Sequence, residues 1–161
     1  IVLLLIAHLL RDYEGETQIE LVAFNGEDYF SVPGQMKYIE ENQDRFDSIL
    51  LNINIDGAGY KEGKSAISFY EVTQLLREKA DSVLIQHPGI VEGPQWPQGD
   101  HSIFLQFGVP AIAVSSQWFT EHINDQQITH TPKDKPDIVD CSKVVEIAEA
   151  LADVITEVVR S

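Results

Sequence analysis

Apolar stretches of two different lengths alternate along the chain, and this alternation constrains the fold more than any other feature. Short apolar runs predict buried strands at residues 19–25, 48–56, 82–87 and 110–116. Longer segments predict helices at residues 1–13, 33–46, 65–80 and 140–159. Strands that alternate with helices, and that are apolar almost throughout, indicate a sheet with helices on both faces. We therefore expect an α/β fold with a mixed, mainly parallel sheet.

The helices expected at the two ends of the chain differ in character. Residues 1–13 (IVLLLIAHLLRDY) predict a helix that is buried on most sides. Residues 140–159 predict a long amphipathic helix with Asp140 as its N-cap. The apolar stripe of this last helix consists of Val144, Ile147, Ala148, Leu151, Ile155 and Val158.

Length and charge limit the classes of function. A chain of 161 residues fits one domain. It has 26 acidic residues against 11 basic ones, a formal charge of −15, which argues against nucleic acid or an anionic membrane as partner. The apolar run at the start is too short to span a bilayer. A single cysteine, Cys141, excludes an intrachain disulfide, and nothing in the chain indicates a cellular compartment.

Polar residues with metal-binding side chains follow several of the predicted strands. Glu27 and Asp28 come after the first strand and Asp56 closes the second, while Asp100-His101 and His130 lie in later loops. In open α/β sheets, ligands bind beyond the carboxyl ends of the strands. Carboxylate oxygens and imidazole nitrogens are ligands for zinc, and a carboxylate beside the ion can take a proton from water. The pattern favours metal-assisted hydrolysis.

Each of these residues also has a simpler interpretation. The pair Glu27-Asp28 suits a solvated turn or a helix cap, and Asp56 beside a Gly-Ala-Gly segment suits a turn. Asp100 before an apolar run suits an N-cap, and His130 suits a hydrogen-bonded loop histidine. Residue types and spacing alone leave both interpretations open.

Four motifs in order along the chain resemble the M28 family of zinc metallopeptidases, which includes many aminopeptidases. They are ELVAFNGEDYF, NINIDGAG, GDHSIFLQFGVPAIAVSS and THTPKDKPDIVD. The resemblance implies that Glu27 is the general base and Asp28 a metal ligand beside it. It further implies that His130 binds the same metal as Asp28 and that Asp56 binds a second metal. Asp100 resembles a carboxylate that orients groups at the substrate, with His101 as its neighbour.

The chain departs from the family pattern in one respect. The family has a histidine in an H-x-D motif and a bridging aspartate before the first helix, and neither has a counterpart here. We therefore expect a truncated and impaired form of the catalytic domain, made of residues 1–161, whose intact version binds one or two zinc ions. Missing early strands would expose a sheet edge, which favours a homo-oligomer.

The sequence thus predicts a metal-dependent exopeptidase, an aminopeptidase acting on peptide substrates. One alternative within the fold is a glutaminyl cyclase-like acyltransferase, which the acidic pair and GDHSIF also suit. Another is a non-catalytic module for binding or dimerisation. Trp96, Trp118 and Phe119 lie near the candidate loops, where they are expected either to line a specificity pocket or to pack in the core.

Overall fold

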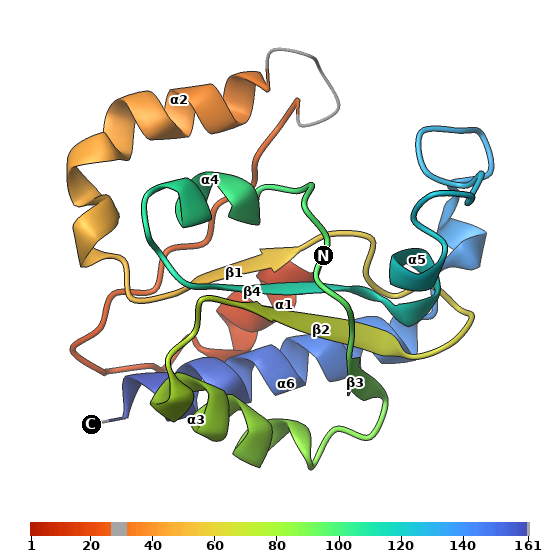
Figure 1. Cartoon of the computed structure of the whole chain (residues 1–161). Helices are drawn as coiled ribbons and strands as arrows, with labels where there is room; N and C mark the ends of the chain where they lie inside the picture. The colour runs from red at the N-terminus through yellow and green to blue at the C-terminus, as the bar shows by residue number, and fades with distance from the viewer. Residues whose placement is uncertain (27–31, 161) are drawn as a thin grey trace.

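Among the residues that the structure describes, four strands form one sheet at the centre of the molecule, shown in a computed structural model of the chain (Figure 1). The structure describes residues 1–26 and 32–160. The strands are β1 (Asn52–Ile55), β2 (Ser65–Tyr70), β3 (Ile90–Glu92) and β4 (Ala111–Ser116), in the order β1-β4-β2-β3. The pairs β1–β4 and β2–β3 are parallel, whereas β2 and β4 are antiparallel. The expected α/β fold with a mixed, mainly parallel sheet is confirmed.

Helices cover both faces of this sheet, giving three layers (Figure 1). One face packs against α1 (Val2–Leu9), α3 (Gln74–Leu84) and α6 (Cys141–Val159). The other face packs against α4 (His101–Gln106), beyond which lie α2 (Pro33–Asn42) and the 3-10 helix η1 (Gln43–Ser48). The short helices α5 (Gln117–Glu121) and η2 (Pro136–Ile138) flank the end of β4 and the start of α6.

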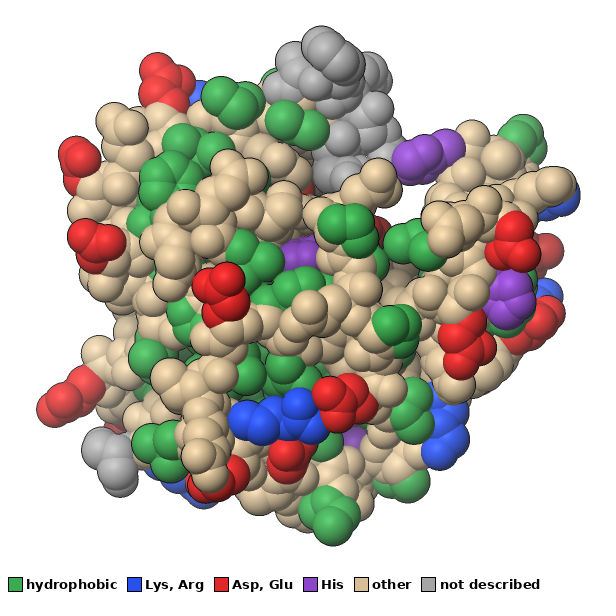
Figure 2. All heavy atoms as spheres, in the orientation of Figure 1, with side chains coloured by type: hydrophobic (Ala, Val, Ile, Leu, Met, Phe, Trp, Pro, Cys, Tyr) green, Lys and Arg blue, Asp and Glu red, His purple; other side chains and the backbone are tan. Residues whose placement is uncertain are grey.

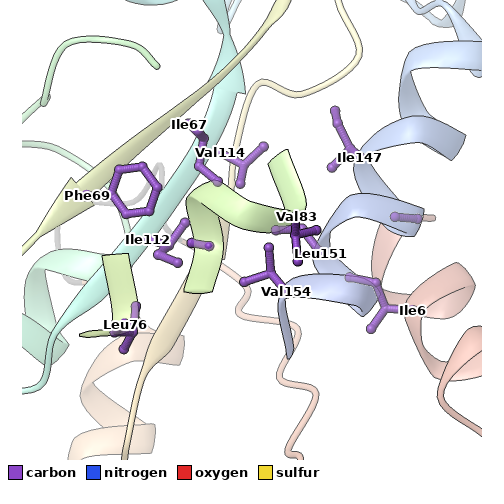
Figure 3. Packing of buried hydrophobic residues seen from close by; sticks show 12 residues of the cluster. Ile6, Ile67, Phe69, Leu76, Val83, Ile112, Val114, Ile147, Leu151 and Val154 are labelled. Carbon is purple, nitrogen blue, oxygen red and sulfur yellow. The ribbon is translucent and has the colours of Figure 1, made fainter. Parts of the chain in front are cut away.

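The main core lies between the sheet and α6. Figure 3 shows Ile147, Leu151 and Val154 of α6 beside Ile112 and Val114 of β4. All six residues of β2 and all six of β4 are buried, because both faces of these central strands are covered. Asp140 caps α6 by accepting a hydrogen bond from the backbone N–H of Ser142 at 2.9 Å, as the sequence predicts.

The structure corrects the interpretation of residues 65–80 as a single helix. Residues 65–70 form β2, Glu71 has a positive φ of 52°, and α3 begins at Gln74 behind Thr73 as N-cap. A strand that is buried on both faces has no polar alternation, so periodicity cannot separate it from a helix. The strand predicted at residues 82–87 is wrong as well, because α3 runs on to Leu84 and the strand comes later, as β3.

Two predictions for the first part of the chain are also wrong. Residues 19–25 are not a β-strand, since none of the four strands pairs with them, and a strand needs a neighbour for its hydrogen bonds. The first helix is α1, and only Ile6 of its residues is buried, while Leu4 is 75% exposed. An apolar sequence predicted burial that the neighbours of α1 do not provide.

Within the described residues, no helix combines the length and the hydrophobicity needed to cross a membrane.

Candidate functional site

The carboxyl ends of β1 and β4 form one side of a cavity. The strands are parallel, and the backbone N–H of Asp56 continues their ladder with a hydrogen bond of 2.9 Å to the oxygen of Val114. Asp56 and Ser115 therefore lie next to each other at the same sheet edge. Both line a cavity of ≈ 560 Å³, which His130 and Asp134 also line from a loop far along the chain. The expectation that ligand-binding groups gather at strand ends agrees with this placement.

The turn after Asp56 depends on glycine. Gly57 and Gly59 have positive φ values of 64° and 87°, a conformation that side chains with a Cβ rarely adopt. A Cβ on Gly57 would lie 2.9 Å from the Oγ of Ser115, and one on Gly59 would lie 2.7 Å from the Cγ2 of Val144. The two glycines let this turn lie directly against β4 and α6.

His130 lies in the loop between α5 and η2, which Figure 1 shows projecting at the right of the sheet. Its backbone has a φ of 59°, in the left-handed region that histidine adopts more readily than most residues. The side-chain oxygen of Gln126 accepts the backbone N–H groups of Ile128 and Thr129 at 2.8 and 3.0 Å. The hydroxyl of Thr131 donates to the oxygen of Ile128 at 2.7 Å. Side chains on both sides of His130 thus fix its backbone.

Aromatic and aliphatic side chains make up much of the remaining wall. Tyr60, Trp96, Phe119 and Ile123 line the cavity. The Tyr60 ring lies 5.1 Å from both Phe119 and Trp118, and burial, followed by the nearby Glu62 carboxylate, raises the pKa of its hydroxyl. Phe119 therefore lines the cavity, while Trp96 meets both open expectations, because it lines the cavity and is also buried in a core cluster.

Trp118 has a different place. Its ring stacks on that of His122 with a centroid distance of 4.5 Å, and it lines a second, neighbouring hollow instead of the cavity that holds Asp56. Figure 2 shows the lobe at the right separated from the main body by a recess.

Asp100 and His101 lie beside the cavity and do not line it. His101 is only 1% exposed, and its Nε2 lies 3.2 Å from the backbone oxygen of Trp96. A carbonyl only accepts, so Nε2 carries the proton, and Nδ1 accepts from the side-chain amide of Asn54 at 3.3 Å. Burial lowers the pKa of His101, against opposing effects of the Trp96 hydrogen bond, Asp56 and Asp100, so the ring is neutral at pH 7.

Asp100 connects two helices. Its Oδ1 accepts a hydrogen bond of 2.6 Å from the side-chain amide of Gln35, which is buried near the start of α2. Asp100 lies directly before α4, so the pair holds the start of α2 against the start of α4. Gly34 is held at the same place, because its N–H donates to the oxygen of Asn25 at 3.1 Å.

The structure describes two of the four residues that are expected to form the metal site and supply its base. Asp56 and His130 lie on one cavity, both exposed at its surface. Glu27 and Asp28 lie outside the described residues. No three His, Cys, Asp or Glu side chains among residues 1–26 and 32–160 converge as a metal site would require. The carboxylate of Asp56 and the imidazole of His130 are donors that suit zinc.

Sequence reasoning missed several residues that build the site. The side chains of Gln126 and Lys143 form hydrogen bonds with backbone groups, Gln126 with the N–H of Thr129 and Lys143 with the oxygen of Tyr60. Backbone partners leave no pattern in the sequence from which such side chains could be found. Gly59 carried a signal, since the GAG after a strand-end aspartate indicated a tight turn. Tyr60 follows that turn directly and had the same signal.

Comparisons with known proteins agree with this fold. The aminopeptidase from Aneurinibacillus sp. strain AM-1 has a TM-score of 0.78 at 18% identity and covers 98% of this chain and 37% of its own. BSAP, a zinc aminopeptidase from Bacillus subtilis, has a TM-score of 0.75 at 17% identity, with 97% and 39% covered. The LapA aminopeptidase of Legionella pneumophila has a TM-score of 0.71 at 14% identity, with 98% and 44% covered. The chain thus spans less than half the length of each. Among curated proteins, none matches significantly.

The layered α/β fold of the chain is the fold of these aminopeptidase structures. The sequence profile of the family described as Peptidase family M28 matches residues 1–155. The chain belongs to this family.

Proposed function

We propose that this protein is a metal-dependent exopeptidase that removes residues from the free amino terminus of peptides, and that residues 1–161 are part of its single catalytic domain. The observation that carries the proposal is the placement of Asp56 and His130. They come from loops 74 positions apart, yet they line one cavity at the strand ends. Membership of a peptidase family supports the assignment, as does the aminopeptidase fold of the structural neighbours.

Asp56, His130 and Asp28 are the residues that would hold zinc. The donors on the cavity are of the types that zinc accepts, one carboxylate and one imidazole. A bound zinc ion would supply Lewis-acid chemistry, polarising the peptide carbonyl and lowering the pKa of water. His130 has a left-handed backbone conformation in a loop segment that Gln126 and Thr131 fix, so its Cα is held at the edge of the cavity before any ion arrives.

The proposed proton transfer belongs to Glu27. Its carboxylate takes a proton from the attacking water and returns it to the amine of the leaving peptide. The carboxylates of Asp56 and Asp134 line the cavity and give it the charge that a protonated amino terminus prefers. Tyr60, Phe119 and Ile123 offer apolar surface to the side chain of the first residue.

The test combines zinc binding with hydrolysis of aminoacyl anilides by the purified protein. The intact enzyme that carries these residues is expected to bind zinc and to release the anilide, and Glu27→Gln in that enzyme is expected to abolish turnover while it keeps zinc affinity nearly unchanged. Asp56→Asn and His130→Gln are expected to weaken zinc binding at least tenfold, since each removes one donor. Full turnover by Glu27→Gln would remove this residue from the mechanism.

The same assay separates the alternatives. Conversion of an N-terminal glutaminyl peptide without hydrolysis of anilides would show a glutaminyl cyclase-like acyltransferase. A folded protein that binds no zinc and acts on neither substrate would show a non-catalytic module.

A further inference from the structure

Lys143 reaches from the first turn of α6 to the loop that follows β1. Its Nζ lies 2.9 Å from the backbone oxygen of Tyr60, 2.8 Å from that of Lys61 and 2.7 Å from that of Gly63. An ammonium group has three hydrogens to donate and no acceptor. The three carbonyl oxygens therefore match the donors of one lysine side chain.

The backbone of this loop is shaped for that contact. Gly57, Gly59 and Gly63 all have positive φ values, and in the turn that they form the carbonyl groups of residues 60, 61 and 63 face one point. Two backbone hydrogen bonds flank that point, from the N–H of Lys61 to the oxygen of Ile138 at 2.9 Å and from the N–H of Asp140 to the oxygen of Gly59 at 2.8 Å. The loop is thus joined by backbone groups to the end of η2 and to the N-cap of α6, both of which precede Lys143 in the chain.

The same loop carries two elements of the cavity. Asp56 immediately precedes it, and Tyr60, whose carbonyl accepts from Lys143, is a buried part of the wall. A change in the position of residues 60–63 therefore moves the Tyr60 ring, which packs against Phe119 on the opposite wall.

We propose that Lys143 is a positioning residue, a built-in monovalent cation that holds residues 57–63 in place and so fixes the Asp56–Tyr60 side of the cavity. Its consequence for catalysis rests on the proposed function, whereas its action on the loop does not. Carbonyl oxygens at this spacing also suit a small free cation with N–H donors, so such an ion can replace the missing ammonium.

The experiment measures residue-resolved amide hydrogen exchange of Lys61 and Asp140 in the purified chain. Lys143→Ala is expected to increase both exchange rates about tenfold or more, because charge-assisted hydrogen bonds that closed the loop are lost. The matched control is Lys79→Ala. Lys79 of α3 donates to the backbone oxygens of Arg160 and Val158 at 2.5 and 3.4 Å, at the end of α6 that is far from Lys143. The Lys79→Ala variant is expected to leave both exchange rates unchanged.

Chemical rescue separates a positioning cation from a side chain that merely packs. Methylammonium is expected to restore slow exchange in Lys143→Ala in a saturable way. Tetramethylammonium at equal concentration, which has no N–H donor, is not. Unchanged exchange in Lys143→Ala, equal changes in Lys79→Ala, or equal effects of the two ions would overturn the proposal.

If Lys143→Ala does not fold, Lys143→Gln keeps two N–H donors without the charge and is measured in its place. Its exchange rates are expected to lie between those of wild type and a fully opened loop, with partial recovery in methylammonium; wild-type rates would reject the role of charge. The near-UV circular dichroism of the Tyr60–Phe119 contact reports the same displacement. None of these measurements uses hydrolysis, so a protein without peptidase activity leaves the result interpretable.

Discussion

The two sides of the cavity are held in place in different ways. The Asp56 side, residues 56–63, is joined to β4 and α6 by backbone hydrogen bonds, by Lys143 and by close contacts at two glycines. The His130 side, residues 122–134, is held by the hydrogen bonds described for Gln126 and Thr131, which close within that loop. We call these the anchored side and the self-supported side. The difference teaches that the backbone of the Asp56 side is bonded to core elements, whereas the bonds of Gln126 and Thr131 stabilise their own loop.

The largest expected effect comes from the core beneath the anchored side. Leu151 of α6 is 1% exposed and lies in the main cluster, so Leu151→Ala should cost about 2–5 kcal/mol of unfolding free energy. Denaturant titration measures the loss. Amide exchange at Asp140 should accelerate with it, whereas exchange at Thr129 should not change. Equal acceleration at both amides would erase the distinction between the two sides.

A smaller loss is expected at the turn of the anchored side. Gly59→Ala forces a Cβ to within 2.7 Å of Val144 at a φ of 87°, and about 1–3 kcal/mol of stability should be lost. Gly108→Ala is the matched control. It has a φ of 75° with no atom within 4 Å of the added Cβ, and it should cost about 1 kcal/mol. If Gly59→Ala costs no more stability than Gly108→Ala, then Val144 and α6 shift easily to make room for the added Cβ.

Acid should weaken β1, the strand that leads into the anchored side, through His101, whose Nδ1 accepts from the side-chain amide of Asn54. Burial lowers the pKa of this histidine in the folded state, so below the ordinary value of 6.5 the unfolded chain binds a proton that the folded chain does not. Stability is therefore full above pH 6.5 and falls as the pH drops toward the folded pKa, by at most about 1.4 kcal/mol per pH unit for one proton. Denaturation of wild type and His101→Gln between pH 7 and about pH 5, above the usual carboxyl range, measures the difference. Parallel curves would rule out His101 as the cause.

The smallest global effect is expected on the self-supported side. Gln126→Ala removes the acceptor of the Ile128 and Thr129 N–H groups, and exchange of these two amides should rise by the equivalent of about 1 kcal/mol. Global stability should change by less than about 0.5 kcal/mol. Gln127→Ala, in which that acceptor remains, should leave both amides as they are. A large loss of global stability in Gln126→Ala would show that this loop, too, is coupled to the core.

The sequence predicted those elements of the fold that a clear apolar run or an N-cap residue marks. The strands at residues 48–56 and 110–116 and the capped helix at 140–159 are confirmed, because apolar runs and an N-cap aspartate have direct structural meaning. Residues 65–70 were misread because burial on both faces removes alternation. Residues 19–25 were misread because a strand requires a partner that the sequence of that segment does not specify.

For the candidate site, the sequence predicted the donors but not their supports. Asp56 and His130 were found from strand-end position and family resemblance, and the cavity contains both. Gln126 and Lys143 were missed since their partners are backbone groups, whose direction exists only after the chain has turned. The metal-binding roles of Asp28, Asp56 and His130 and the roles of Glu27, Asp100 and His101 stay predictions. The acidic surface stays without an assigned role, and Figure 2 shows its carboxylates scattered over the visible face.

The pairing of β1 with β4 has a consequence for how the molecule assembles. Asn52 pairs with Ala111 across two intervening strands and two helices of the chain, whereas β2 and β3 are neighbours in sequence. Closing the longer segment of chain costs more conformational entropy than closing the shorter one, and long-range pairing slows folding. The pairing that places Asp56 beside β4 is therefore the more costly of the two parallel pairings to form.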